Sequence, residues 1–527
     1  MIARSFLRCS ATRRLQTCRP RMVLAKPRKF STSTPPAANA NSSSTASMLG
    51  AFTNELDRIA PKFEIQGSQI QILRTPSDFY ETLKSKILGA EKQIFLSTLY
   101  IGKTEHELIS TLHQALKSKP NLKLSILTDA LRGTRESPEP SCASLLAPLV
   151  DEFGSDRVEI RMYHTPNLTG LRKKYIPRRI NEGWGLQHMK LYGVDDEIII
   201  SGANLSNNYF TDRQDRYHVF SSREITSYFF KIHSAVSNLS FLVTPDPQNP
   251  TGYTLDWPSS NLAPSPLIDP KKYISASSSI LNPLIKPSST ITTTTSPHPK
   301  ANTTVYPLSQ LTQLLDPDTS TELPSITHIL HTLSSPTFST SSWTFTAGYF
   351  NPDPSLTTLL LSAASKTNTV ITASPYANGF YGSKGVSGLL PAAYTLLSRR
   401  FLERAQKSGR ENDIALKEWR RGTVGEKGGW TYHAKGLWIS LNGEQEPSLS
   451  IVGSSNYTKR SYGLDLEVGT CIVTSDEGLK GRLREERDGL QEFAGKVGID
   501  DFLGVERRVG IQVRIAMWIV KMVGGAL

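Results

Sequence analysis

Hydrophobic residues recur along the chain with two periodicities, one helical and one strand-like. Phe79, Leu83 and Ile87 recur every four residues, as on one face of a helix, and Thr75 or Ser77 can cap that helix. Further helices are predicted at residues 105–116, 359–365 and 387–407. Short apolar runs predict strands at 94–101, 122–127, 158–162, 187–192 and 197–200, and again at 343–350, 370–373, 433–441, 449–452 and 466–473. This alternation predicts an α/β fold with a mixed-sheet core in each half of the chain.

Between the two halves lies a stretch of different composition. Residues 245–299 are dense in Pro, Ser and Thr and end in a run of Ser and Thr. Such a stretch buries too little apolar surface to offset the entropy lost on ordering. We therefore expect a linker or surface excursion at 245–305, between a first domain at 60–244 and a second domain at 306–502.

The N-terminal segment has the composition of a targeting sequence. Residues 1–54 contain no acidic residue, and nine Arg or Lys residues precede a run rich in Ser, Thr and Ala. This composition is typical of a mitochondrial transit peptide, whereas a secretory signal needs an apolar core that arginine does not interrupt. A basic arm that binds nucleic acid is the alternative. We expect a transit peptide and disordered arm over residues 1–47.

Charge and cysteine content narrow the class of protein. The 527 residues include 60 Lys and Arg against 47 Asp and Glu, a net charge of +13, which suits a nucleic acid, a phospholipid surface or a phosphorylated metabolite. Four cysteines in so long a chain argue against a small disulfide-rich secreted scaffold. No run of about 18 uncharged apolar residues occurs, so a conventional transmembrane helix is not predicted.

The most informative feature is a set of polar residues that occurs once in each half. Each set contains a His-x-Lys pair, an Asn just past the next strand, and a carboxylate eleven residues after that Asn. The first set is His188, Lys190, Asn204 and Asp215, and the second is His433, Lys435, Asn456 and Glu467. Because residues i and i+2 of a strand face the same side, each His and Lys should point into one site.

This combination suits transfer at a phosphodiester. Lysine and asparagine donate to the nonbridging oxygens as charge shifts in the transition state. One histidine attacks phosphorus and becomes a phosphohistidine, while a carboxylate on its other nitrogen fixes the tautomer. The second histidine protonates the leaving oxygen and then accepts a proton from the incoming hydroxyl. The mechanism requires no metal and no cofactor, and the sequence contains no Cys/His cluster with zinc spacing.

These motifs resemble those of the phospholipase D superfamily, whose signature is His-x-Lys-x(4)-Asp followed by Gly-x-x-Asn or a close variant. His188, Lys190 and Asp195 fit it in full, whereas the second copy has Ser440 in place of the Asp. The resemblance implies two domains, each a mixed sheet flanked by helices, related by pseudo-twofold symmetry with the active site between them. It implies that the catalytic residues are His188, Lys190, Asp195, His433 and Lys435. The residues that bind or orient the phosphate would be Asn204, Asn456, Asp215 and Glu467.

Longer strings at residues 95–102, 202–217 and 377–385 resemble the mitochondrial phosphatidylglycerophosphate synthases. That resemblance implies phosphatidyl transfer from CDP-diacylglycerol to glycerol 3-phosphate through a phosphatidyl-histidine, in phosphatidylglycerol and cardiolipin synthesis. It also implies a place on the matrix face of the mitochondrial inner membrane. We expect His188 to be the nucleophile, because its motif is complete, and His433 to be the acid and base.

Other functions are compatible with the same residues. A phospholipase D-type hydrolase would use water as the acceptor. A tyrosyl-DNA phosphodiesterase also uses two His-x-Lys pairs, but no interleaved aromatic and basic stripe lies near the motifs, so we expect no nucleic-acid partner. A membrane-surface protein with an inactive site is disfavoured by the intact His and Lys of both copies.

Two basic regions lie outside the motifs. The first consists of Arg172, Lys173, Lys174, Arg178 and Arg179, and it predicts binding of the acceptor's phosphate or of anionic headgroups, or else a solvated loop. The second is the mainly apolar tail, residues 503–527, with Arg507, Arg514 and Lys521 at intervals of seven. The tail predicts a helix in the interface of an anionic membrane. A strand over 509–515 and a buried terminal helix are the alternatives.

Overall fold

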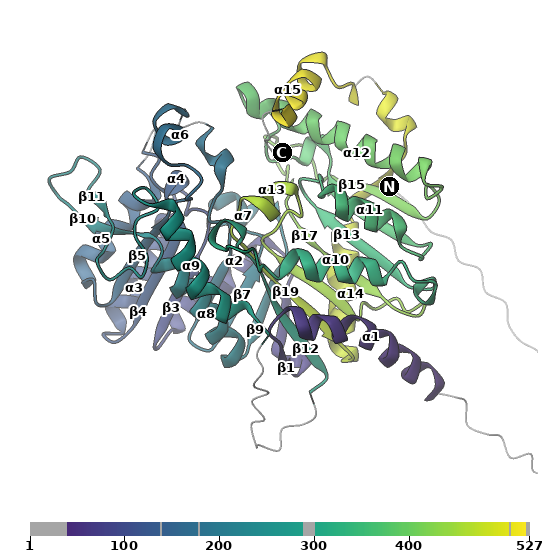
Figure 1. Cartoon of the computed structure of the whole chain (residues 1–527), viewed down its shortest axis with the longest axis horizontal. Coiled ribbons are helices and arrows are strands. Elements are labelled where there is room, and N and C mark those ends of the chain that lie inside the picture. Colours follow the sequence, from purple (N-terminus) through teal and green to yellow (C-terminus); the bar gives the residue numbers. More distant parts are fainter. Residues whose placement is uncertain (1–38, 137–139, 178–179, 288–300, 505–506, 523–527) are drawn as a thin grey trace, which may run out of the picture. The chain divides into compact units, whose positions relative to one another are not determined.

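Two nine-stranded mixed sheets form the framework of the computed structural model (Figure 1). The first is built from residues 70–256, and the second from residues 303–497 together with one strand at residues 63–65. The structure describes residues 39–136, 140–177, 180–287, 301–504 and 507–522. The first sheet contains β2 (Ile70–Leu73), β3 (Gln93–Ser97), β4 (Lys123–Asp129), β5 (Val158–Tyr163), β6 (Leu191–Val194), β7 (Glu197–Ser201), β9 (Tyr217–Ser221), β10 (Phe241–Pro245) and β11 (Tyr253–Asp256). The second contains β1 (Phe63–Ile65), β12 (Thr303–Gln310), β13 (Ser342–Ala347), β14 (Asn368–Ala373), β15 (Ile414–Trp419), β17 (Lys435–Ser440), β18 (Leu449–Gly453), β19 (Glu467–Thr474) and β20 (Ala494–Val497).

Eight strands of each sheet follow the same order. The order is β2-β9-β7-β6-β3-β4-β5-β10 in the first sheet and β12-β19-β18-β17-β13-β14-β15-β20 in the second. Both contain a parallel trio, β3-β4-β5 or β13-β14-β15, with an antiparallel strand on either side. The predicted α/β architecture with a mixed sheet in each half is confirmed.

Helices flank both sheets (Figure 1). In the first half they are α2 (Pro76–Gly89), α3 (His106–Ser118), α4 (Ala130–Gly133), α5 (Cys142–Phe153), α6 (Gly170–Tyr175), α7 (Asn207–Thr211), α8 (Arg223–Ser237) and α9 (Pro270–Ile285). In the second half they are α10 (Glu322–Thr332), α11 (Pro354–Ser362), α12 (Leu390–Lys407), α13 (Lys459–Gly463), α14 (Glu477–Gln491) and α15 (Ile511–Met522). Thr75 caps α2 as predicted, because its hydroxyl accepts from the backbone N–H of Asp78 at 3.0 Å. The helix predicted at 359–365 begins earlier, at Pro354, where proline at the first position favours a helix start.

An apolar layer joins the two halves. One buried cluster contains Ile198 and Ile200 of β7 together with Val468 and Ile472 of β19. A second cluster lies within the first half. A third combines residues 306–502 of the second half with Met48, Phe52, Leu56 and Ala60 near the start of the described chain. The strands that carry the two polar sets are therefore held against one another by burial of apolar side chains.

The segment expected to be a linker is folded over most of its length. Residues 245–287 include β11 and α9, whose Tyr273 and Leu281 are fully buried. This part of the segment folds because Tyr273, Ser277 and Leu281 recur every four residues, so one face of the helix packs on the core. The overall composition does not reveal this spacing. Residues 288–300 lie outside the described residues.

The two ends of the chain differ from the expectations in detail. The transit-peptide prediction for residues 1–38 falls outside the described residues, whereas residues 39–47 begin helix α1 (Asn39–Ile59). Residues from Ser44 onward belong to one compact unit. Near the C-terminus α15 is a helix, so the strand alternative over 509–515 is wrong. No helix within the described ranges is both long and apolar enough to cross a membrane.

Candidate active site

Each His-x-Lys segment pairs with a short backbone segment from the opposite half. Strand β16 (Thr431–Tyr432) runs parallel to β8 (Arg213–Gln214), and the backbone N–H of His433 donates to the carbonyl of Gln214 at 2.8 Å. In the same manner, the N–H of His188 donates to the carbonyl of Leu466 at 2.9 Å. Residues 186–188 therefore pair with the other half, and although the predicted strand began at residue 187, β6 itself begins only at Leu191.

This pairing gives each histidine a carboxylate from the opposite half. His188 Nδ1 lies 2.9 Å from both carboxylate oxygens of Glu467. His433 Nδ1 lies 2.6 Å from Asp215 Oδ2. The four residues are buried. A ring whose Nδ1–H donates to a carboxylate presents Nε2 as its reactive nitrogen, and the two carboxylates favour this tautomer in both histidines. At His433 the ammonium group of Lys435 also lies 2.7 Å from Nδ1.

The two lysines lie under the histidines with their ammonium groups buried. Lys190 Nζ donates to the carbonyl of His188 at 2.7 Å. Lys435 Nζ donates to the carbonyl of His433 at 3.0 Å and lies 3.5 Å from Asp215 Oδ2. Burial lowers the pKa of Lys190 to about 7 and that of Lys435 to about 8. Both cations therefore titrate close to neutral pH.

Burial also perturbs the histidines and their carboxylates. It raises the pKa of Glu467 to about 7 and moves that of Asp215 upward. Burial, and next the positive charge of Lys190, lowers the pKa of His188 well below its ordinary range. For His433 burial comes first, followed by four neighbouring basic groups from both halves, Lys435, Arg213, Lys190 and His188. The two sets thus share one electrostatic environment, in which an unliganded histidine stays neutral and nucleophilic.

The asparagines supply polar atoms that the protein itself leaves unused. The side-chain oxygens of Asn204 and Asn456 are buried, and neither has a hydrogen-bond partner within the described part of the chain. Asn204 Nδ2 donates to the hydroxyl of Tyr209 at 3.2 Å. A buried amide without its full set of partners is costly, so both side chains are suited to bind a polar ligand.

The surroundings of Gly202 explain why a residue without a side chain stands two positions before Asn204. A Cβ at this position would lie 2.7 Å from Asp215 Oδ1 and 2.8 Å from Lys435 Nζ. Only a residue without a side chain permits the carboxylate of the first half and the lysine of the second half to approach so closely.

Three site residues were not predicted from the sequence: Arg213, Tyr209 and Tyr349. Arg213 donates to the Tyr349 hydroxyl at 2.8 Å, and its guanidinium lies 4.5 Å from the centre of the Tyr209 ring. The two tyrosine rings meet the His433 ring edge-on at 5.2 and 5.5 Å. Arg213 thus adds a buried, permanently charged group beside the second histidine. The available signal was its position two residues before Asp215.

Asp195 does not belong to this site. Its carboxylate accepts from the backbone N–H groups of Glu91, Lys92 and Gln93 at 2.8, 2.8 and 3.0 Å, and so fixes the start of β3. Asp195 directly follows the last residue of β6, whereas His188 lies three residues before the first, so the two residues stand at opposite ends of that strand. The expectation that Asp195 is catalytic is therefore corrected. In the second copy the matching position is Ser440, the last residue of β17. Because this position stands at the far end of the strand from His433, the lack of a carboxylate there does not alter the second polar set.

The basic cluster upstream of the first motif lies on and after α6. Arg172, Lys173 and Lys174 are exposed, and none of the three bonds to either polar set among the residues described. Arg178 and Arg179 fall outside the described residues. Nor do the described residues bring three or more His, Cys, Asp or Glu side chains together in a metal-binding arrangement.

The histidine pair and the repeated sheets can be set beside known proteins. No protein-family model matches the chain. The CDP-diacylglycerol–glycerol-3-phosphate 3-phosphatidyltransferase of Saccharomyces cerevisiae is 43% identical over 486 residues, which cover 90% of this chain and 92% of that protein. The chain belongs to this phosphatidyltransferase family. The resemblance seen in the motifs is confirmed.

Other members of the phosphatidyltransferase family are similar over comparable lengths. That of Schizosaccharomyces pombe is 42% identical over 83% of this chain and 92% of its own length. The human member, which is named mitochondrial, is 32% identical over 88% of this chain and 84% of its own length. Among solved structures, phosphatidylserine synthase of Haemophilus influenzae superposes with a TM-score of 0.66 at 18% identity, over 90% of this chain and 96% of that chain. That likeness supports the fold.

Proposed function

We propose that the chain transfers the phosphatidyl group of CDP-diacylglycerol to the sn-1 hydroxyl of glycerol 3-phosphate, giving phosphatidylglycerophosphate and CMP. The observation that carries the proposal is the pair of buried histidines, each bonded at Nδ1 to a carboxylate of the opposite half. The relatives named for this reaction support the choice of substrates. The product is the precursor of phosphatidylglycerol and cardiolipin.

In the first step Nε2 of His188 attacks the β-phosphorus of CDP-diacylglycerol. The phosphorus–oxygen bond to CMP breaks, and His433 gives its proton to the departing oxygen. Burial lowers the pKa of His433, and the negative charge of the bound diphosphate would oppose this and favour the protonated form. The greater exposure of the His188 side chain, 11% against 4% for His433, supports its role as the attacking group.

In the second step the sn-1 hydroxyl of glycerol 3-phosphate gives its proton to His433. The hydroxyl oxygen attacks the same phosphorus, and the bond to His188 breaks. Lys190 and Lys435 are placed to donate to the nonbridging oxygens in both steps. The two asparagines would donate to the same oxygens through their Nδ2 groups, whereas their buried, unpartnered side-chain oxygens can only accept, for example from a substrate hydroxyl. Both histidines then regain their starting protonation.

Product analysis tests the overall reaction. CDP-diacylglycerol supplied with glycerol 3-phosphate should yield phosphatidylglycerophosphate, and omission of the acceptor should stop turnover. Phosphatidic acid formed regardless of acceptor would indicate a hydrolase, and absence of reaction would refute the proposal.

The roles of the two histidines need a separate test. With labelled CDP-diacylglycerol, His433→Ala should retain label on the protein and His188→Ala should not. The opposite pattern would reverse the assignment.

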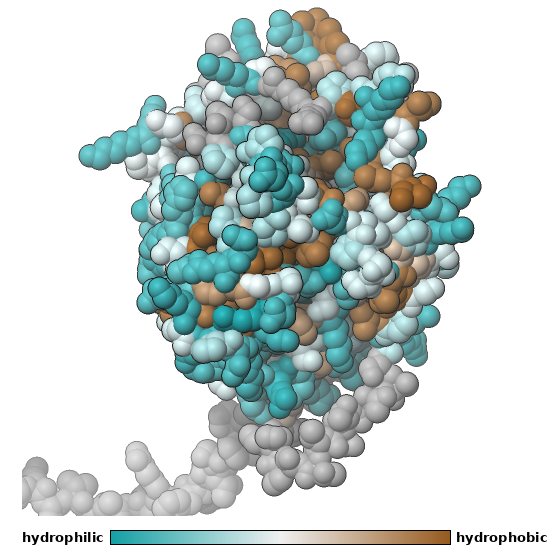
Figure 2. Space-filling model, turned by 90° about the vertical axis from the view of Figure 1, so that its left-hand side faces the viewer, coloured by the Kyte–Doolittle hydropathy of each residue, from teal (hydrophilic) through white to brown (hydrophobic). Residues whose placement is uncertain are grey.

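We also propose peripheral contact with an anionic membrane, on the matrix face of the mitochondrial inner membrane. Ile511, Ile515 and Trp518 of α15, at positions i, i+4 and i+7, are 73%, 52% and 62% exposed, so one apolar face of this helix meets solvent. Hydrophobic residues are visible at the top of Figure 2, where α15 lies in Figure 1. Vertebrate relatives named mitochondrial support the location. Replacing these three residues with Ser should reduce binding to all vesicles, and unchanged binding would contradict the contact.

A further inference from the structure

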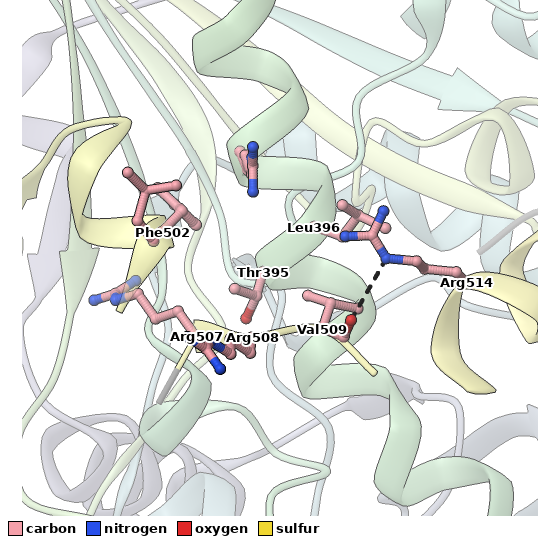
Figure 3. A pocket seen from close by; sticks show the side chains of 9 residues that line it. Thr395, Leu396, Phe502, Arg507, Arg508, Val509 and Arg514 are labelled. Atoms are coloured by element: carbon pink, nitrogen blue, oxygen red, sulfur yellow. Dashed lines mark hydrogen bonds between the residues drawn. The ribbon is translucent and has the colours of Figure 1, made fainter. Parts of the chain in front are cut away.

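A pocket of about 300 Å³ lies between α12 and the segment that leads into α15 (Figure 3). Four arginines line it: Arg399, Arg507, Arg508 and Arg514. Thr395 and Phe502 contribute a hydroxyl and an aromatic wall, and none of the lining residues is acidic. The pocket shares no residue with the two polar sets of the active site.

Two of the four positive charges are neutralised within the protein. Arg507 pairs with the buried carboxylate of Glu418 at 2.6 Å, and Arg399 pairs with Glu403 at 2.8 Å. Arg508 and Arg514 have no carboxylate partner in the described part of the chain, and Arg514 Nε donates only to the carbonyl of Val509, at 3.4 Å (Figure 3). Two uncompensated guanidinium groups at one pocket repel each other, and an anion between them offsets that repulsion.

The surrounding sequence strengthens the positive potential. Residues 354–402, which include α12 as far as Leu402, contain no Asp or Glu, and neither do residues 507–527. The one acidic residue of α12 is Glu403, which pairs with Arg399. Arginine presents a planar fork of donors that matches the oxygens of a phosphate. The chemistry of the pocket therefore suits a phosphate group.

The exposed face of α15 indicates what carries this phosphate. Ile511 and Ile515 flank Arg514 on the same helix, and Leu503, which lines the pocket, is 60% exposed. Val513 is buried and fixes the helix against the protein. A soluble phosphate metabolite would leave this apolar surface in water, whereas a phospholipid places its phosphate and its acyl chains side by side.

We propose that this pocket binds the phosphate of an anionic phospholipid in the bilayer, at a second lipid site separate from the histidines. The inference rests on the proposed function only in taking the bilayer as the source of substrate. Through this site anionic lipid anchors α15 in the interface, and activity on a bilayer then depends on a lipid that the enzyme does not consume.

Vesicle binding by the full chain tests the proposal. The double variant Arg508→Gln/Arg514→Gln is compared with Arg58→Gln/Arg223→Gln, which removes two exposed arginines, at 77% and 79% exposure, from other surfaces. On phosphatidylcholine vesicles containing phosphatidylglycerol, the pocket variant should bind about 10- to 30-fold more weakly than wild type, and the control by less than about threefold. On pure phosphatidylcholine vesicles both variants should bind like wild type.

Further measurements separate the possible failures. Activity in neutral detergent micelles should be the same in both double variants and wild type, because the pocket lies outside the catalytic site. Equal binding of the two variants to anionic vesicles would overturn the proposal. So would a thermal shift with inorganic phosphate that only the pocket variant loses while its vesicle binding stays normal, because the ligand would then be soluble. A change in oligomeric mass instead of vesicle binding would assign the surface to a second copy of the chain.

Discussion

Glu467→Gln is the substitution that best tests whether each histidine depends on a carboxylate from the opposite half. The amide has nearly the same shape, but it replaces a carboxylate oxygen 2.9 Å from His188 Nδ1 with a group that no longer favours the Nδ1–H tautomer. Glu467 is fully buried, so water cannot take over its role. We expect the substitution to act on the histidine of the opposite half.

The magnitude follows from the bond that is lost. A hydrogen bond to a charged group contributes about 1.5–3 kcal/mol, which corresponds to a reduction in kcat of about 10- to 150-fold. The assay is CMP release from CDP-diacylglycerol at saturating glycerol 3-phosphate. Single-turnover labelling of the protein should slow by the same factor, because the proposed first step needs His188 in the correct tautomer.

Glu322→Gln is the matched control. Glu322 is a buried glutamate of the same half, and burial raises its pKa to about 8, so it is neutral at pH 7 and the amide replaces a neutral group. Its activity should stay within about twofold of wild type. If Glu467→Gln keeps wild-type kcat, or if Glu322→Gln loses as much activity, the reasoning is refuted.

Three further predictions concern pH and stability. Glu467, with a pKa of about 7, gains a proton as the pH falls, whereas Lys190 and Lys435, with pKa values of about 7 and about 8, lose their charge as the pH rises, so kcat/KM should peak near pH 7. Lys190→Arg should extend the alkaline limb, because Lys190 is the first of the two lysines to lose its charge, and an unshifted limb would contradict this assignment. Asp195→Ala should lower the free energy of unfolding in urea by about 1–3 kcal/mol, because three backbone N–H groups lose their acceptor. A large loss of kcat in this variant would instead show that Asp195 contributes to the active site. Arg216→Met should cost about 3–5 kcal/mol in the same measurement, because it leaves Glu486 buried without its cation, and a loss below about 1 kcal/mol would contradict this.

The sequence contains the periodicities that predict the sheets and the contents of the site, but little about contacts between distant segments. Strand periodicity correctly placed each His beside its Lys, because both belong to one short segment. It did not reveal that Glu467 serves His188, since that contact joins residues 279 apart in the chain. Composition was misleading for α9, where four Ser and two Pro fall within 16 residues but Tyr273 and Leu281 determine the packing.

Motif matching failed for a related reason. Asp195 satisfies the superfamily signature by its spacing along the chain, yet the strand between it and His188 places it at the other end of β6. Arg213 has no place in the signature, although it lies beside His433 with Tyr349. A signature records which residues recur, and only the fold distinguishes those that support a strand from those that face a substrate.

The reciprocal exchange of carboxylates has a consequence for how such an enzyme can diverge. Two identical copies of one repeat, paired in this way, would build a symmetric site in which both histidines have the same surroundings. Joining the repeats in one chain removes that constraint, so one histidine can take Glu467 and the other Asp215, and Arg213 can stand where the second half has Asp465. The two histidines can then evolve different roles, one as nucleophile and one as acid. Each half can change its own residues while it still supplies the carboxylate for the histidine of the other half.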